Sequence, residues 1–267
     1  MTGNSSQARS RDNRIILQGR DMHFLRELSL MGVTDCEQAK IVAGFHSTTR
    51  VNARLLALTR AGLLKRFFLG SGGGRKALYT LSPKGALAAD VPSRGPRRPQ
   101  DAMLVADYFV RHQLTVNDIY CTLKYKTIPV QHVTFHRWLA FYQPVVPEVR
   151  LIPDGYVEFA TPTGITTCFL EVDLGHESLA IWTGKVRNYL QLALSGGYQK
   201  QFGRERFRVL VIANTGRRLH SIRKAVAEIT QKMFWFATLE SVRGDFFGPI
   251  WFRPAENQPT TLIEKIP

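Results

Sequence analysis

Acidic side chains gather in two short stretches of this sequence. Asp154 lies in the segment 151–155, and Glu171 and Asp173 lie in the segment 168–173. We expect a strand at 165–174, and side chains alternate between the two faces of a strand. Glu171 and Asp173 are therefore expected on the same face, with backbone positions about 7 Å apart. Carboxylates this close repel each other unless a positive group intervenes.

A hard divalent cation is a natural positive group for such acids, because Mg²⁺ binds one or two carboxylates together with several waters. We expect Asp154, Glu171 and Asp173 to hold Mg²⁺ or Mn²⁺, with a hairpin bringing Asp154 beside the other two. Such an ion polarises a phosphodiester, activates water and stabilises the leaving oxygen. The sequence therefore predicts metal-dependent phosphodiester cleavage.

The helix expected at 178–194 follows directly and adds further groups. Glu177 and Lys185 are eight residues apart and share a helix face. Lys185 is expected to stabilise charge on a phosphate or to orient the attacking water. His176 is adjacent to the acids and could assist. Tyr189 could in principle attack phosphorus, although its place on the apolar side of the helix favours a packing role.

The second part of the chain, 101–267, mixes strands and helices. Besides the strand and helix already named, we expect strands at 155–161, 207–214 and 234–239, and helices at 102–112, at 115–124 after a break, and at 219–233. Residues 127–142 are ambiguous. This order predicts an α/β sheet covered by helices. Basic residues of this part are either lining a DNA path or solvated: Lys200, Arg204, Arg206, Arg208, Arg217, Arg218, Arg223 and Lys224.

Positive charge is concentrated in the first hundred residues. The whole chain has a net charge of +15, and residues 1–100 hold 17 basic and 6 acidic residues. Such a balance favours a polyanionic partner, nucleic acid before membrane. The sequence therefore predicts the main DNA-binding surface in its N-terminal part.

The block 19–91 has the pattern of a winged helix-turn-helix. Three helices are expected at about 22–31, at 35–44 and at 47–61, where Val51, Leu55 and Leu58 form a buried stripe. Strands at 64–69 and 76–81 flank a glycine-rich turn, which is the wing. The third helix is expected to enter a DNA groove. The predicted DNA contacts are Ser47, Thr48, Arg50, Arg54, Lys65, Arg66, Arg75 and Lys76.

Two other interpretations of this block are a protein-interaction domain and a nucleotide-binding domain. A three-helix protein-interaction domain with a solvated basic face would give a similar pattern. The glycine run does not indicate a nucleotide-binding loop, because Arg75, Lys76 and a strand follow it instead of GK[ST] and a helix.

Composition along the chain predicts four segments: a basic disordered arm at 1–18, the DNA-binding domain at 19–91, a Pro/Arg linker at 92–100 and the α/β domain at 101–267. Cys36, Cys121 and Cys168 are far apart and form neither a disulfide framework nor a zinc motif. Neither a signal peptide nor an 18-residue apolar run is recognised. We therefore expect a cytoplasmic protein without membrane insertion.

The order Pro153-Asp154, a strand pair, Glu171-x-Asp173 and a helix resembles the PD-(D/E)XK nuclease superfamily. The resemblance implies a central mixed sheet flanked by helices and Mg²⁺-dependent cleavage. Asp154 and Glu171 match the two acids of the superfamily. Asp173 stands where its pattern has lysine, and Lys185 on the next helix would supply that lysine.

The longer string 169–179, followed by Lys185 and Tyr189, resembles the replication-relaxation family of plasmid proteins, in which a winged helix precedes a nuclease-like domain. Within that group the chain is most similar to MobC-type relaxases, over about 19–214. This resemblance implies a relaxase that nicks one strand of double-stranded DNA at a plasmid transfer origin. It also implies other mobilisation proteins and a coupling protein as partners.

Two alternatives to a nickase remain open at this stage. One is a non-catalytic DNA-binding protein, either a replication or mobilisation accessory factor or a repressor, with an inactive nuclease fold. The other is an adaptor that docks other transfer proteins.

Overall fold

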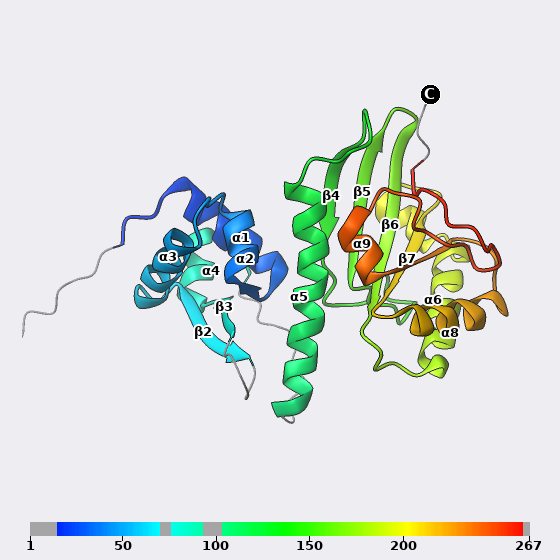
Figure 1. The fold of residues 1–267 in the computed structure, drawn as a ribbon, viewed down its shortest axis with the longest axis horizontal. Helices are drawn as coiled ribbons and strands as arrows, with labels where there is room; N and C mark the ends of the chain where they lie inside the picture. Colours follow the sequence, from blue (N-terminus) through cyan, green and yellow to red (C-terminus); the bar gives the residue numbers. More distant parts are fainter. Residues whose placement is uncertain (1–14, 70–75, 93–102, 264–267) are drawn as a thin grey trace, which may run out of the picture. The chain divides into compact units, whose positions relative to one another are not determined.

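The computed structural model describes residues 15–69, 76–92 and 103–263, and divides into two compact units (Figure 1). The N-terminal unit is Met1–Asp107 and the C-terminal unit is Tyr108–Pro267. Most of the predicted basic arm, the glycine-rich turn with Arg75, and most of the predicted linker lie outside the described residues. Each unit is described by itself below.

The N-terminal unit combines short helices with a three-stranded antiparallel sheet in the order β1-β3-β2. Its elements are α1 (Gly19–Met31), β1 (Thr34–Asp35), α2 (Cys36–Val42), α3 (Thr48–Arg60), β2 (Leu64–Leu69), β3 (Lys76–Leu81) and α4 (Pro83–Ala89). The three helices and two long strands expected from the sequence are present. The short β1 and the closing α4 were not predicted.

Local sequence signals explain where these helices begin and end. The Asp35 side chain accepts a hydrogen bond from the backbone N–H of Gln38 (2.8 Å) and caps α2. Ser82 caps α4 in the same way through Gly85 (2.9 Å). Beyond α3, Gly62 has a φ of +76°, a left-handed conformation that favours glycine just after a helix.

Helix α3 buries Val51, Leu55 and Leu58, as predicted, but the structure differs from the prediction at Arg54. Its Nε donates to Asp21 Oδ1 (2.8 Å), and its Nη2 donates to Asp21 Oδ2 and to the carbonyl of Ile16. Asp21 is almost fully buried and needs a positive partner. Arg54 therefore joins α3 to α1, whereas we expected it to contact DNA.

The C-terminal unit is built on a five-stranded mixed sheet in the order β4-β5-β6-β7-β8 (Figure 1). The strands are β4 (Thr134–Leu139), β5 (Gly155–Thr161), β6 (Gly164–Asp173), β7 (Arg208–Ala213) and β8 (Phe234–Thr238). The first three are antiparallel, whereas β7 and β8 run parallel to β6. This arrangement confirms the expected mixed α/β architecture.

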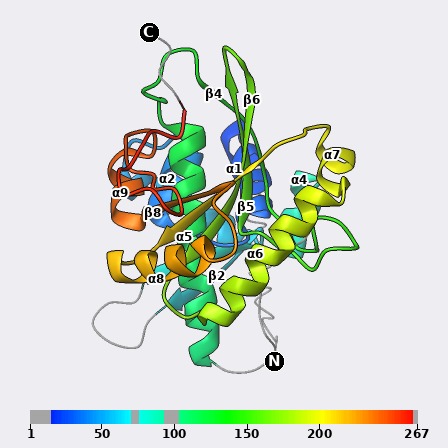
Figure 2. The same ribbon diagram turned by 90° about the vertical axis from the view of Figure 1, so that its right-hand side faces the viewer.

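Helices cover both faces of this sheet (Figure 2). One face packs against α5 (Met103–Tyr125) and α9 (Leu239–Asp245). The other packs against α6 (Leu179–Leu194), α7 (Gly197–Phe202) and α8 (Gly216–Ala227). Helix α5 is continuous where we expected a break. Helix α8 begins earlier than expected because Thr215 caps it through the N–H of Arg218 (3.2 Å), and it also ends earlier, at Ala227.

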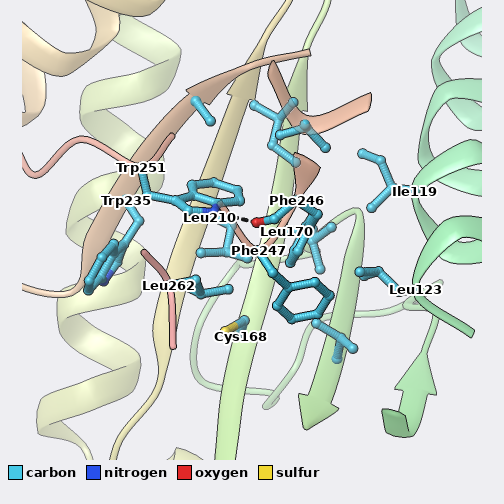
Figure 3. Packing of buried hydrophobic residues seen from close by; sticks show 14 of the residues in the cluster. Ile119, Leu123, Cys168, Leu170, Leu210, Trp235, Phe246, Phe247, Trp251 and Leu262 are labelled. Carbon is cyan, nitrogen blue, oxygen red and sulfur yellow. Dashed lines mark hydrogen bonds between the residues drawn. The ribbon is translucent and has the colours of Figure 1, made fainter. Parts of the chain in front are cut away.

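Side chains of β6 alternate between the two cores, as predicted. Cys168, Leu170 and Val172 belong to the core beneath α5 and α9, whereas Phe169 belongs to the core beneath α6 and α8. Figure 3 shows the first of these cores, in which the indole N–H of Trp251 donates to the carbonyl of Phe246 (2.8 Å). The alternation directs Glu171 and Asp173 toward the α6 face.

Within the described residues, none of the helices combines the length and the apolar character needed to cross a membrane.

The Arg54–Asp21 pair gives a test of the N-terminal unit. Replacing Arg54 with Met leaves a buried carboxylate without its partner, so we expect Arg54→Met to lower the free energy of unfolding by about 3 kcal/mol. Arg50→Met, at an exposed position of the same helix, is the matched control and should change it by less than about 0.5 kcal/mol. Urea denaturation measures both, and equal losses would contradict the structural role of Arg54.

Candidate active site

Asp154 lies immediately before β5 and extends its pairing with β6. Its backbone N–H donates to the carbonyl of Leu170 (3.1 Å), and its carboxylate Oδ2 accepts from the N–H of Val172 (2.7 Å). The side chain therefore takes the place of a backbone acceptor in the β5–β6 ladder. The hairpin does bring Asp154 beside β6, as we expected from the sequence.

His112, on α5, holds this carboxylate from the other side. Its Nε2 lies 3.2 Å from Asp154 Oδ2 and 2.8 Å from the carbonyl oxygen of Val172. Burial opposes protonation of the imidazole, but the Asp154 carboxylate outweighs burial and raises the pKa of His112 to about 9. Burial likewise opposes ionisation of Asp154, whereas the positive charges of His112 and Lys185 lower its pKa.

Glu171, on β6, is buried against α6. Its Oε2 accepts from Lys185 Nζ (2.7 Å) and its Oε1 accepts from the Tyr189 hydroxyl (2.7 Å). Burial raises the pKa of Glu171, Lys185 opposes that rise, and Asp154 adds to it. Tyr189 is fully buried, so it orients Glu171 from within the core, in agreement with the packing role considered for it.

Lys185 stands at the centre of the acidic groups. Besides Glu171, its Nζ lies 2.8 Å from Glu177 Oε1. Glu177 precedes the N-cap of α6, so this contact comes from the loop and not from the shared helix face that we expected. The ammonium also lies 5.1 Å from the centre of the Trp182 ring. Burial disfavours the charge on Lys185, but Glu171, Asp154 and Glu177 outweigh it and raise the pKa. The ammonium therefore stays protonated.

Glu177 lies in the loop between β6 and α6. Whereas its Oε1 pairs with Lys185, its Oε2 is buried and has no hydrogen-bond partner among the described residues. An unpaired buried carboxylate oxygen is costly, and such an atom in a folded protein calls for an explanation.

Asp173 differs from the prediction. Its carboxylate accepts two hydrogen bonds from Arg218 (2.9 and 2.7 Å), one from Trp182 Nε1 (2.7 Å) and one from the N–H of Gly175 (2.6 Å). Burial opposes ionisation of Asp173, but these donors lower its pKa. The acid is thus neutralised by a guanidinium and is not available as the metal ligand that we expected.

The predicted trio of acids therefore does not assemble. Over residues 15–69, 76–92 and 103–263, no three His, Cys, Asp or Glu side chains converge closely enough to hold a metal ion. Asp154, immediately before β5, and Glu171 of β6 remain beside each other, with Lys185 near both. These two carboxylates offer the hard oxygen donors that Mg²⁺ or Mn²⁺ takes.

Two aromatic groups lie near these acids. The exposed His176 packs edge-on against Tyr108 of α5, with 4.0 Å between the ring centres. Burial and the nearby carboxylates of Glu177, Asp173 and Asp154 raise the pKa of Tyr108. Sequence reasoning missed Tyr108, and it missed the role of His112, because both lie more than 50 residues before the start of β6.

The residues predicted to contact DNA in the N-terminal unit differ in exposure and in the groups that they contact. Thr48, Arg50 and Lys65 are exposed. The guanidinium of Arg66 lies 4.7 Å from the centre of the Phe68 ring, and Lys76 pairs with Asp35. Ser47 is half-buried, and Arg75 lies outside the described residues.

Comparison with known proteins gives one family. Residues 22–205 match the replication-relaxation family. The chain belongs to this family. The match begins within α1 and includes the other helices and strands of the N-terminal unit, as well as the segment of the C-terminal unit that carries Asp154, Glu171 and Lys185.

Among solved structures, that of the restriction endonuclease FokI is similar at 11% sequence identity, with a TM-score of 0.30. The similarity covers 84% of this chain and 43% of the FokI chain, so this member of the replication-relaxation family spans less than half of that structure. No curated protein matches the sequence.

The Asp173–Arg218 pair can be tested by a double-mutant cycle. Because both groups are largely buried and joined by two hydrogen bonds, we expect Asp173→Asn and Arg218→Met to show a coupling energy of at least about 2 kcal/mol in the free energy of unfolding. The exposed neighbour Arg217, paired with the same Asp173→Asn change, is the control and should show almost none. A coupling near zero for Arg218 would contradict the pairing.

Proposed function

We propose that this protein is a metal-dependent DNA endonuclease, a relaxase or nickase that cuts one strand at a plasmid transfer origin for conjugative mobilisation. The observation that carries the proposal is the meeting of Asp154, Glu171 and Lys185 where β5 pairs with β6. Membership of the replication-relaxation family supports a role in plasmid replication or mobilisation. The order of acids and lysine is the one that resembles PD-(D/E)XK nucleases.

The chain's own residues have distinct tasks in this proposal. Asp154 and Glu171 hold the divalent cation, which when bound supplies Lewis-acid activation of the phosphodiester. His112 fixes the Asp154 carboxylate, and Tyr189 fixes that of Glu171. Lys185 stabilises negative charge on the phosphate undergoing cleavage. Asp173 acts indirectly, because with Arg218 it anchors the loop that carries Glu177.

The N-terminal unit is proposed to be the winged helix-turn-helix that positions the duplex. Helix α3 would enter a groove, and the β2–β3 hairpin would be the wing. Contacts to DNA come from Ser47, Thr48, Arg50, Lys65, Arg66, Arg75 and Lys76, whereas Arg54 supports α3 through Asp21. Other mobilisation proteins and a coupling protein are proposed partners on the basis of the MobC-type resemblance.

A second candidate function is a non-catalytic DNA-binding protein of plasmid replication or mobilisation. The observation that favours it is the neutralisation of the acids, since Arg218 occupies Asp173 and Lys185 occupies Glu171 and one oxygen of Glu177. This alternative expects sequence-specific binding that persists when the acids are removed, without cleavage in any metal.

Nicking of supercoiled plasmid distinguishes the two functions. With Mg²⁺ or Mn²⁺ and the cognate origin, we expect the wild type to produce open circles, and Asp154→Asn or Glu171→Gln to slow nicking at least about 100-fold because charge stabilisation at the phosphate is lost. Glu148→Gln, at an exposed glutamate, is the control and should nick normally. Equal rates for the wild type and Glu171→Gln would remove the assignment.

Salt dependence of binding tests the N-terminal unit. If Lys65 neutralises a DNA phosphate, Lys65→Ala should weaken binding of all duplexes alike and reduce the slope of log K against log salt by about 1. Fluorescence anisotropy at several salt concentrations gives this slope. Lys232→Ala, an exposed lysine of the C-terminal unit, provides the comparison, and an unchanged slope for Lys65→Ala would exclude that contact.

A further inference from the structure

We propose that the C-terminal unit has a phosphate-binding pocket beside the β5–β6 hairpin, which takes a phosphate group through Arg208, Thr166 and Gln131. The phosphate belongs either to a free nucleotide or to the backbone of a nucleic acid strand. This inference goes beyond the proposed cleavage and does not depend on it, because the pocket is separate from the acids of the candidate active site.

The pocket lies at the end of the sheet where β5 turns into β6. It has a volume of about 240 Å³, and its polar lining residues are Gln131, Thr161, Thr163, Thr166 and Arg208. That is room for several waters, yet less than the roughly 300 Å³ at which pockets for drug-sized ligands begin. The pocket therefore suits a small polar group such as a phosphate, alone or with its sugar.

The pocket and the acids lie on opposite faces of the sheet. Thr166 and Glu171 both belong to β6, but they are an odd number of residues apart and so point to opposite faces. Their backbone positions are separated by about 17 Å of extended strand. Arg208 shares the face of Leu210, which belongs to the core beneath α5 and α9. A phosphate in the pocket is therefore not the one that the acids are proposed to cleave.

Arg208 supplies the positive charge of the pocket. Its Nη1 donates to the carbonyl of Leu262, and its guanidinium lies 4.9 Å from the centre of the Trp235 ring, in the core shown in Figure 3. Within the described part of the chain it forms no ion pair with a carboxylate. A guanidinium has five N–H donors, so most of them remain for a ligand, and phosphate is an acceptor that their geometry fits.

A second guanidinium increases the positive charge near Arg208. Arg253 lies 4.6 Å from the centre of the same Trp235 ring. Burial lowers the pKa of Arg253, Glu256 opposes this decrease, and Arg208 adds to it. The two guanidinium groups therefore repel each other. A phosphate bound at Arg208 would offset this repulsion.

Neutral donors complete the pocket. Thr166 and Gln131 line it, and over the described ranges neither side chain forms a hydrogen bond, whereas Thr161 already donates to the carbonyl of Gly164 (2.9 Å). A hydroxyl offers one donor and a primary amide offers two. None of the described residues that line the pocket carries a carboxylate. Donors without a competing acid are the surroundings that an anion needs.

Inorganic phosphate added to the full-length protein tests the pocket, with the indole N–H signal of Trp235 in heteronuclear NMR spectra as the readout. The chain has four tryptophans, and Trp235→Phe identifies the signal. Because Arg208 lies against the Trp235 ring, phosphate bound there should shift this signal in a saturable way. Chloride at the same ionic strength should not shift it, since general screening does not require the pocket.

Three variants assign the binding to the pocket. Arg208→Gln removes the charged donor and should weaken phosphate binding at least about tenfold. Thr166→Val keeps the shape and removes the hydroxyl, so it should weaken binding about threefold. This second variant removes no side-chain hydrogen bond within the described residues, so it serves even if Arg208→Gln is unstable. Arg187→Gln, at an exposed arginine of α6, is the control and should bind like the wild type.

Two further ligands distinguish the sources of the phosphate. Thymidine monophosphate represents a free nucleotide, and a thymidine tetranucleotide without a terminal phosphate presents only backbone phosphates. If the monophosphate shifts the Trp235 signal at lower concentration, the source is a free nucleotide, and the reverse order identifies a nucleic acid backbone. Either order supports the pocket, provided that Arg208→Gln weakens the effect.

A Trp235 signal that phosphate leaves unchanged overturns the inference. Equal phosphate binding by the wild type, Arg208→Gln and Thr166→Val overturns it as well. None of these measurements uses DNA cleavage, so a wild type that nicks no plasmid would reject the proposed nuclease function and leave the pocket supported.

Discussion

The ion pairs of Lys185 are the interaction on which the rest of the C-terminal unit depends. Glu171 is buried on a central strand, and a buried carboxylate is tolerated only when a positive group and hydrogen bonds compensate for its lost hydration. Lys185 and Tyr189 of α6 supply both. Helix α6, one of the helices that cover this face of the sheet, therefore also neutralises Glu171 through Lys185. The contacts that pack α6 on the sheet and those that stabilise this acid come from the same helix.

A second buried acid is stabilised differently. Asp173 is fixed by Arg218 of α8, which also contacts the loop that leads into α6. One acid of β6 is thus bound to a rigid bidentate guanidinium and the other to a flexible ammonium. The physical difference between these two cations gives Asp173 two guanidinium hydrogen bonds and Glu171 one ammonium hydrogen bond.

How far the sequence could predict this site depends on the separation of its parts. The alternation on β6 follows from local periodicity and is confirmed. Glu177 does meet Lys185, but from the loop before α6 and not from a shared helix face. The role of Arg218 did not follow, because it comes from a helix 45 residues beyond Asp173 that packs here only in the folded chain. The contact of His112 with Asp154 was missed for the same reason.

The measurement that tests the account most directly is diffraction from crystals of the full-length protein soaked in Mn²⁺, using the anomalous signal of the metal. The account predicts one peak between Asp154 and Glu171, the two carboxylates that are proposed to hold the cation. A Lys185 ammonium still bridging Glu171 and Glu177, without an anomalous peak at saturating Mn²⁺, would contradict it.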